Sequence, residues 1–195
     1  QFLEVEGVAL NSYLISAMVH ACGKCGEPVL ARAYFDAAAR SSPSEVDITC
    51  YNALMDAFGR CGDVDSVFAL LRTITTTQRT PPGPTKRRPA EYFGLQLGLL
   101  PNTRSFNIAI CAAARAQDVT KARAAWERMC RTQDAEPTHH TFSTLIRLAG
   151  ESGDLVWATD LYNKMRETGL RPNNHVASAF LSVRCSHGCC TISCV

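Results

Sequence analysis

The stretch DITCYNALMDAFGRCGDVDSVFALL, residues 47–71, contains two apolar patterns of helical period separated by a glycine. The first pattern comprises Tyr51, Leu54, Met55 and Phe58, and the second comprises Val64, Val67, Phe68 and Leu71. Apolar residues spaced three and four apart form one face of an amphipathic helix. Gly62 suits the left-handed conformation that ends a helix, and Asp63 can cap the amides of the next one. The stretch therefore predicts a helical hairpin.

The hairpin pattern occurs four times along the chain. Its hinges are Gly26-Glu27, Gly62-Asp63, Gln117-Asp118 and Gly153-Asp154, and Ser16, Asn52, Asn107 and Ser143 occupy one equivalent place, 36, 55 and 36 residues apart. The tail GLLPN at 98–102 matches GLRPN at 169–173, so the long middle gap is assigned to an insertion at residues 75–97. A single array is predicted, with repeats 12–47, 48–102, 103–138 and 139–173, a partial repeat 174–185, and an irregular Cys-rich tail 186–195.

Composition sets broad limits on the class of protein. The 195 residues are 46% hydrophobic, which predicts a folded core, and the formal charge of +2 neither favours nor excludes a nucleic-acid partner. Many of the ten cysteines fall in apolar helical runs, which favours a reducing compartment. No apolar run approaches the roughly 20 residues of a membrane-spanning helix, so we expect a soluble protein without membrane insertion. No Arg-rich and Ser-rich leader is evident, so a targeting peptide is expected to be removed or to lie outside this sequence.

Residue types decide between families of helical repeats. The hairpins lack the Trp-Gly-Tyr spacing of tetratricopeptide repeats. ITCYNALMDAFGRCGD (48–63), TRSFNIAICAAARAQD (103–118) and HHTFSTLIRLAGESGD (139–154) instead resemble the pentatricopeptide repeat, whose consensus is close to V-V-T-Y-N-x-L-I-x-x-x-x-K-x-G with a closing G-x-x-P-D or P-N. The resemblance covers residues 12–173. It implies an all-α fold, a right-handed α-solenoid of about four to five helix-turn-helix repeats whose first helices line the concave surface.

The same resemblance implies binding of single-stranded RNA, with one base read by the fifth and last residues of each repeat. The candidate reading pairs are Ser16 with Asp47, Asn52 with Asn102, Asn107 with Thr138, and Ser143 with Asn173. By the family's preferences, Ser with Asp favours guanine, Asn with Asn a pyrimidine, and Ser with Asn adenine, whereas Asn107 with Thr138 has no firm assignment. Apolar residues beside the fifth position are expected to wedge between successive bases.

Each of these features also has a purely structural interpretation. Asn and Ser in a first helical turn are common as capping residues, and their recurrence is what favours a binding groove. Lys86, Arg87 and Arg88 in the insertion could contact phosphates or a protein partner, or form a solvated loop. Lys24, Arg60 and Arg115 precede the hinges, where they could contact backbone phosphates, but solvated helix ends are expected. His139 and His140 are expected to be exposed polar residues at a repeat boundary.

The sequence favours no catalytic or metal chemistry. Cys185, His187, Cys189, Cys190 and Cys194 cluster in the tail, but their spacing fits none of the familiar zinc sites. No nucleophile with a base, paired carboxylates or phosphate-binding glycine loop is evident, so we predict no enzyme, no cofactor, no metal and no small-molecule substrate.

Two functions are compatible with these features. The first is a single-stranded RNA-binding protein that acts in RNA metabolism or in a ribonucleoprotein of a mitochondrion or plastid, together with other proteins. The alternative is a structural scaffold of a large organellar assembly such as a ribosome, which would bind mainly protein. Polar fifth positions in all four repeats favour RNA, and a short array with an insertion favours the scaffold.

Overall fold

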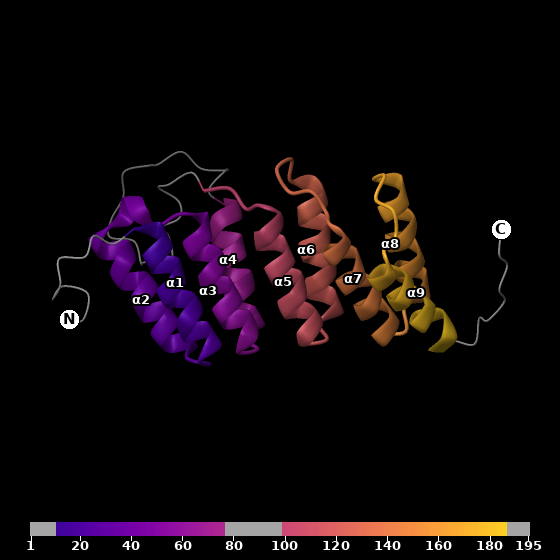
Figure 1. The fold of residues 1–195 in the computed structure, drawn as a ribbon, viewed down its shortest axis with the longest axis horizontal. Helices are drawn as coiled ribbons and strands as arrows, with labels where there is room; N and C mark the ends of the chain where they lie inside the picture. The colour runs from indigo at the N-terminus through magenta and orange to yellow at the C-terminus, as the bar shows by residue number, and fades with distance from the viewer. Residues whose placement is uncertain (1–10, 77–98, 187–195) are drawn as a thin grey trace. The chain divides into compact units, whose positions relative to one another are not determined.

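In the computed structural model, residues 11–76 and 99–186 are described, and they are organised entirely as helices and connecting turns. The helices are α1 (Ser12–Lys24), α2 (Pro28–Ser41), the short 3-10 helix η1 (Pro43–Glu45), α3 (Ile48–Arg60), α4 (Val64–Thr76), α5 (Thr103–Arg115), α6 (Val119–Arg131), α7 (His139–Glu151), α8 (Leu155–Glu167) and α9 (Asn174–Ser186). Figure 1 shows them as successive hairpins. The prediction of an all-α protein built from helical hairpins is confirmed.

The hinges of the hairpins have a positive φ angle at one residue. Gly26, Gly62 and Gly153 have φ values of 76°, 81° and 78°, and Gln117 takes the equivalent place with φ 56°. A residue with a Cβ atom pays a steric penalty in this region, which glycine avoids. The left-handed hinge conformation is thus kept where the glycine itself is replaced.

Aspartates after three of these hinges cap the following helices. Asp63 accepts from the amide of Ser66 at 3.0 Å, and Asp118 accepts from that of Lys121 at 2.9 Å. Asp154 accepts from Trp157 N at 2.9 Å. These bonds satisfy amide groups that have no partner within the first turn of a helix. The capping that the Gly-Asp pattern predicts is therefore present.

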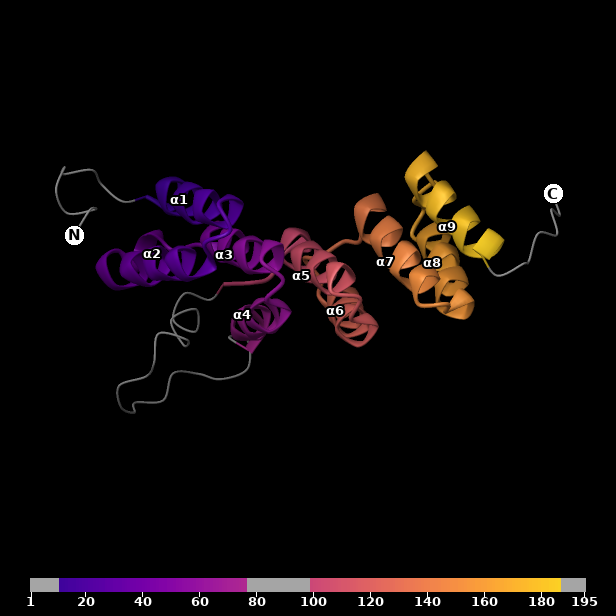
Figure 2. The same cartoon turned by 90° about the horizontal axis from the view of Figure 1, so that it is seen from below.

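The chain divides into two compact units, Gln1–Ile108 and Ala109–Val195. In the first, α1 packs along α3, the first helix of the next hairpin, as Figures 1 and 2 show. A Cβ atom added to Gly23 would lie 2.7 Å from both the Cα and the Cβ of Ala57, so these helices approach closely at Gly23. The Phe35 and Tyr51 rings meet edge to face with centroids 4.9 Å apart, and this contact stabilises the packing of α2 against α3.

The second unit repeats this packing. Helix α7 packs against α8 and α9, and Figure 2 shows these three helices together. Trp126 of α6 meets Phe142 of α7 edge to face at 5.3 Å, and the Tyr162 and Phe180 rings stack at 4.5 Å between α8 and α9. In each unit the first helices of successive hairpins contact each other, and the second helices pack against them, as expected for stacked hairpin repeats.

The predicted insertion lies largely outside the described residues. Helix α4 continues through Thr76, so the prediction that the insertion begins at Thr75 includes the last two residues of a helix. Helix α9 extends to Ser186, one residue beyond the predicted partial repeat, and the Cys-rich tail after it is not described. None of the helices in residues 11–76 and 99–186 is long and apolar enough to cross a membrane.

Candidate nucleic-acid interface

The last residue of each predicted repeat is the N-cap of the next first helix. Asp47 Oδ1 accepts from the amide of Cys50 at 3.0 Å, Asn102 Oδ1 from that of Ser105 at 3.1 Å, Thr138 Oγ1 from that of Thr141 at 3.4 Å, and Asn173 Oδ1 from that of Val176 at 3.0 Å. Asn11 has the same role before α1, at 2.8 Å from the amide of Leu14. Every candidate reading residue at a repeat end therefore has a structural role.

The two serines at the fifth position bond to their own helix. Ser16 donates to the carbonyl of Tyr13 at 2.9 Å and Ser143 to that of His140 at 3.1 Å. Both side chains are partly exposed. Because a hydroxyl also has acceptor lone pairs, either serine can accept a hydrogen bond from a ligand without losing its helix contact.

Asn52 is in a different environment from these serines. It is only 2% exposed, its Nδ2 donates to Asn102 Oδ1 at 3.4 Å, and its Oδ1 accepts from Ser105 Oγ at 2.7 Å. Ser105 is fully buried, and its single hydroxyl hydrogen is shared between Asn52 Oδ1 and Asn102 Oδ1, which lies 3.1 Å from the hydroxyl. The structure thus brings the second reading pair together, but the two amides bond to each other and to a serine that the sequence did not single out.

Asp47, the partner predicted for Ser16, bonds elsewhere. It accepts from the Ser12 hydroxyl at 2.7 Å in addition to its backbone contacts. Burial acts to raise the pKa of Asp47, but hydrogen bonds from Ser12 and from the amides of Cys50 and Thr49 outweigh it and lower the pKa. Asp47 is therefore a charged cap that joins the starts of α1 and α3.

The third pair is not assembled within either unit. Asn107 belongs to the first unit and Thr138 to the second. Asn107 is partly exposed on α5, while Thr138 is exposed and forms a reciprocal capping box with Thr141 at the start of α7.

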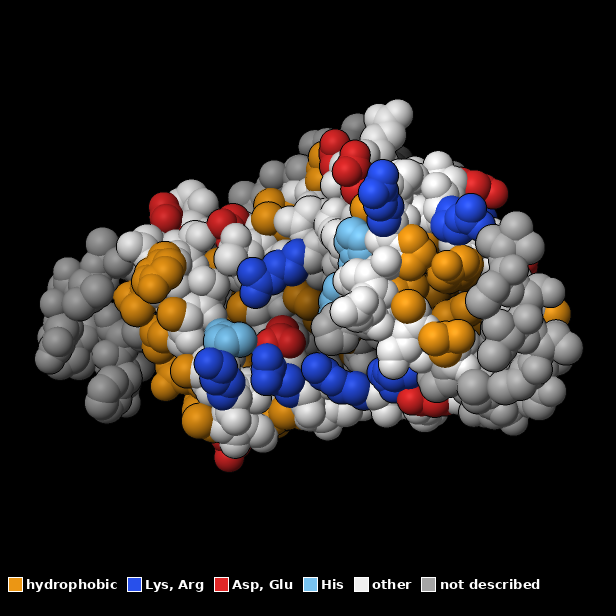
Figure 3. Space-filling model, turned by 45° about the vertical axis from the view of Figure 1, so that its right-hand side comes forward, with side chains coloured by type: hydrophobic (Ala, Val, Ile, Leu, Met, Phe, Trp, Pro, Cys, Tyr) orange, Lys and Arg blue, Asp and Glu red, His pale blue; other side chains and the backbone are white. Residues whose placement is uncertain are grey.

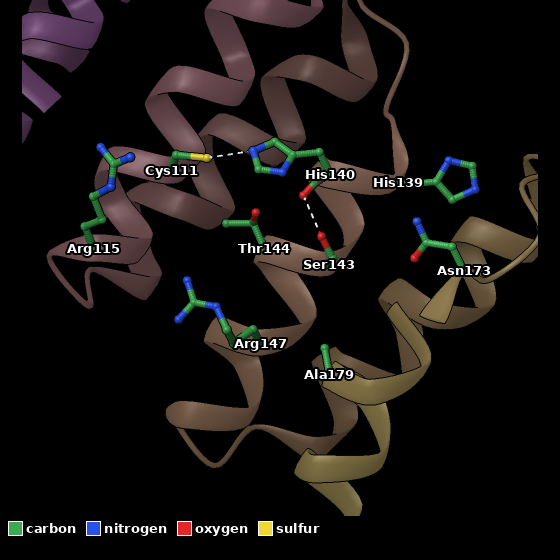
Figure 4. Close-up of a pocket in the computed structure, with 9 residues that line it drawn as sticks. All are labelled: Cys111, Arg115, His139, His140, Ser143, Thr144, Arg147, Asn173 and Ala179. Carbon is green, nitrogen blue, oxygen red and sulfur yellow. Dashed lines mark hydrogen bonds between the residues drawn. The ribbon is translucent and has the colours of Figure 1, made fainter. Parts of the chain in front are cut away.

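The fourth pair lies in a hollow on the second unit. This hollow has a volume of about 660 Å³ and is lined by Cys111, Arg115, His139, His140, Ser143, Thr144, Arg147, Asn173 and Ala179. Figure 4 shows these side chains, which come from α5, from α7, from Asn173 just before α9 and from Ala179 within α9. We call it the inner hollow, since it is formed by successive first helices. Its volume lies in the usual range for small-ligand sites.

Polar and cationic groups surround the fourth pair. His139 lies 2.9 Å from the carbonyl of Arg171, and His140 Nε2 lies 3.3 Å from Cys111 Sγ. Arg147 forms an ion pair with Glu151 at 2.6 Å. Figure 3 shows lysine, arginine and histidine side chains exposed on the surface in view. The histidines predicted as exposed boundary residues thus belong to a site with guanidinium groups, which suits an anionic, hydrogen-bonding ligand.

Other predicted cations lie apart from a defined site. Lys86, Arg87 and Arg88 fall outside the described residues. Lys24 and Arg60 are the final residues of α1 and α3, and Arg60 pairs with Asp56 at 2.8 Å. A cation at the carboxyl end of a helix also interacts favourably with the helix dipole, so local electrostatics account for these two positions.

Among the described residues, no three His, Cys, Asp or Glu side chains come together as a possible metal site. The tail cluster from Cys185 to Cys194 lies beyond the described side chains. The Cys111 and His140 pair was missed by sequence reasoning because 29 residues separate its members.

The arrangement defines a class of protein, a helical-hairpin repeat protein. A family model described as the PPR repeat matches residues 49–75 and 140–170. These segments fall in two of the hairpins identified from the sequence. These two hairpins are therefore similar in sequence to the pentatricopeptide repeat.

The relatives are Arabidopsis thaliana proteins. The chain is 22% identical to pentatricopeptide repeat-containing protein At5g06540 over 191 residues, covering 92% of this chain and 30% of that protein. It is 24% identical to the chloroplastic protein At5g48730 over 164 residues, covering 76% of this chain and 32% of that protein. The chain therefore spans about a third of the length of these relatives.

Solved structures share the fold. The crystal structure of PPR10 from maize superimposes with a TM-score of 0.75 at 20% identity, over 96% of this chain and 24% of that one. The pentatricopeptide domain of protein-only RNase P 1 from Arabidopsis thaliana, solved in complex with tRNA, gives a TM-score of 0.65 at 16% identity, over 91% of this chain and 82% of that one. The fold is thus that of pentatricopeptide α-solenoids.

Proposed function

We propose that this chain binds single-stranded RNA through its first helices and acts in an organellar ribonucleoprotein. The observation that carries the proposal is the inner hollow, where the predicted reading pair Ser143 and Asn173 lies beside guanidinium and imidazole groups. RNA needs both kinds of contact, because cations neutralise its phosphates and polar side chains distinguish its bases.

The related structures support the ligand class. PPR10 has been solved in complex with an 18-nt psaJ RNA element, at a TM-score of 0.69 and 19% identity to this chain. The organellar setting is supported by the chloroplastic relative.

The fourth repeat is proposed as the principal base reader of this array. Asn173 Oδ1 caps α9, while its Nδ2 group offers two hydrogens to a base. Ser143 supplies a hydroxyl from the adjacent first helix. Adenine presents acceptor nitrogens and an amino donor to such a pair, in agreement with the preference expected for Ser with Asn.

The second repeat is proposed to contribute less. Asn52 and Asn102 already bond to each other and to Ser105, so a base would have to replace contacts that stabilise the fold. Specific recognition by repeats one to four is therefore expected to be uneven along the strand.

Fluorescence anisotropy with short single-stranded RNAs tests this function. We expect binding that weakens with salt, and tighter binding to an oligonucleotide with adenine than with guanine at the fourth position. Asn173→Asp should reverse that preference by about tenfold, the order expected from one good base contact, while keeping the cap. Asn11→Asp, at the N-cap before α1, is the matched control and should not change it. If the wild type binds RNAs that differ only in the base at the fourth position with equal affinity, base reading by this pair is refuted.

A scaffold role is the second candidate, because the second helices expose valines at equivalent places. Val29 of α2 is 80% exposed and Val156 of α8 is 73% exposed, each being the second residue of its helix. Substitutions that remove a positive charge from the inner hollow should not affect protein binding through these helices. Assembly that survives Arg147→Ala but fails with Val29→Asp and Val156→Asp would favour the scaffold.

A further inference from the structure

One contact in the inner hollow has a chemistry that RNA binding does not use. Cys111 Sγ lies 3.3 Å from His140 Nε2, and Figure 4 shows the thiol of α5 and the ring of α7 pointing toward each other. A thiol hydrogen-bonded to an imidazole nitrogen can transfer its proton to that ring. The product is a thiolate, the form of cysteine that acts as a nucleophile.

Cationic side chains line the same hollow as this pair. Arg115 lies one turn after Cys111 on α5, and Arg147 lies two turns after His140 on α7, all lining the same hollow. Guanidinium groups near a thiolate stabilise its negative charge. The carboxylate of Glu151 offsets part of this field, since it pairs with Arg147 at 2.6 Å. Gln117 also donates to Glu151, at 2.7 Å, which engages that carboxylate further.

The other described thiols lack this environment. Burial raises the pKa of Cys50 to about 11 and also raises the pKa of Cys22 and of Cys130. Cys25 and Cys61 are exposed, and each directly follows the carboxyl end of a helix. Cys111 is thus the described thiol with both a base and nearby cations.

We infer that Cys111 is a thiol modification site that reacts with small anionic disulfides, glutathione disulfide being the chemical type, and that the adduct closes the inner hollow to RNA. The first part rests on the geometry of Cys111 and His140. The second rests on the proposed RNA-binding function.

The reaction balances without any other oxidant. His140 accepts the proton of Cys111, and the thiolate attacks one sulfur of the disulfide. The new S–S bond forms as the old one breaks, and the departing thiolate takes the proton from the imidazolium. The protein gains a mixed disulfide and one small thiol is released. The carboxylates of the attached group would lie within reach of Arg115 and Arg147, the cations that RNA phosphates would otherwise contact.

Reactivity can be measured on the whole chain in the absence of RNA. The protein is incubated with glutathione disulfide at neutral pH and quenched with acid, and the occupancy of each cysteine is followed by peptide mass spectrometry. Cys25 and Cys61 serve as internal references, since they are more exposed than Cys111. We expect Cys111 to react about tenfold faster than either, because an ordinary thiol is only a few per cent thiolate at pH 7.

A base variant separates activation from accessibility. His140→Asn should lower the Cys111 rate to that of the reference cysteines and leave their rates unchanged, with circular dichroism confirming that helix content is retained. A Cys111 rate no higher than the references would overturn the inference, and so would a fast rate that persists in His140→Asn.

The consequence for binding is measured separately. RNA affinity of the Cys111 adduct should fall by about tenfold or more, as for loss of a few phosphate contacts, and should return after reduction with dithiothreitol. As a control, treatment of the Cys111→Ser variant with glutathione disulfide should leave its RNA affinity unchanged. An adduct that binds RNA as well as the unmodified protein would overturn the closure. Absence of RNA binding before modification would refute the proposed function, while the reaction rates would still decide the reactivity of Cys111.

Discussion

Asn52 and Ser143 occupy the same place in their repeats, yet replacing each by alanine should have opposite consequences. Asn52→Ala removes the acceptor of Ser105 Oγ at 2.7 Å and a long donor contact to Asn102 at 3.4 Å. Ser143→Ala removes only a partly exposed contact with the carbonyl of His140 at 3.1 Å. We therefore expect Asn52→Ala to lower stability and Ser143→Ala to lower RNA affinity.

The magnitude for Asn52 follows from its burial. The hydrogen bond to Ser105 contributes about 1 kcal/mol, and leaving a buried group without a partner costs about 1 to 3 kcal/mol more. That second cost is reduced here, because Ser105 Oγ keeps Asn102 Oδ1 as an acceptor at 3.1 Å. Alanine recovers about 0.5 kcal/mol through its higher helix propensity. The free energy of unfolding should thus fall by about 1 to 2 kcal/mol, against less than about 0.5 kcal/mol for Ser143→Ala.

Urea denaturation followed by circular dichroism measures both changes. Since repeat arrays can unfold in parts, hydrogen exchange of amides in α3 and at the start of α5 should accompany it and show faster exchange only in Asn52→Ala. RNA anisotropy on the same samples supplies the second readout. The reasoning fails if Asn52→Ala is as stable as the wild type, or if it weakens RNA binding more than Ser143→Ala does.

Three further perturbations test the packing and the electrostatics. Gly23→Ala should destabilise the protein by about 1 to 2 kcal/mol, since its Cβ would meet Ala57 at 2.7 Å, and a double-mutant cycle with Ala57→Gly should show recovery of part of the loss; additive effects would contradict the close approach. Gln117→Ala should raise the pKa of Glu151 toward its ordinary value, because the hydrogen bond from Gln117 is the main cause that lowers it. NMR titration of the Glu151 carboxyl measures this change, and an unchanged pKa would mean that the bond is absent in solution. The pKa of Asp118 is lowered, mainly by the hydrogen bond from the amide of Lys121. Ionised Asp118 therefore stabilises the folded protein fully above the ordinary pKa of about 3.9, and this contribution is lost as the pH falls below that value. Asp118→Asn retains a cap, so its stability should depend less on acid than that of the wild type over that range, and equal acid sensitivity would refute this role.

The sequence predicted the hairpins because their signals are local. Gly62 and Asp63 specify the end of one helix and the start of the next within a few residues, and the apolar spacing on either side determines which face is buried. Such features need no knowledge of distant contacts. Even the replacement of glycine by Gln117 was recognised, because Asp118 and the flanking helices kept their places.

The candidate site was predicted less completely, because it depends on contacts between repeats. The period placed Ser143 and Asn173 in corresponding positions, and they line one hollow. Period alone could not show that Asn52 bonds with Ser105, since the contact depends on how α5 approaches α3 across a long insertion. The Cys111 and His140 contact was invisible for the same reason, as neither residue has a local motif.

The capping role of the residues that end each repeat restricts any redesign of the array. Asn11, Asp47, Asn102, Thr138 and Asn173 all accept a hydrogen bond from the first turn of the following helix. Only short side chains with an acceptor oxygen do this well. Helix capping therefore limits which residue types can stand at this proposed base-reading position. A lysine or leucine there would change the ligand preference only by weakening the start of a helix, so recoding is confined to exchanges among Asn, Asp, Ser and Thr.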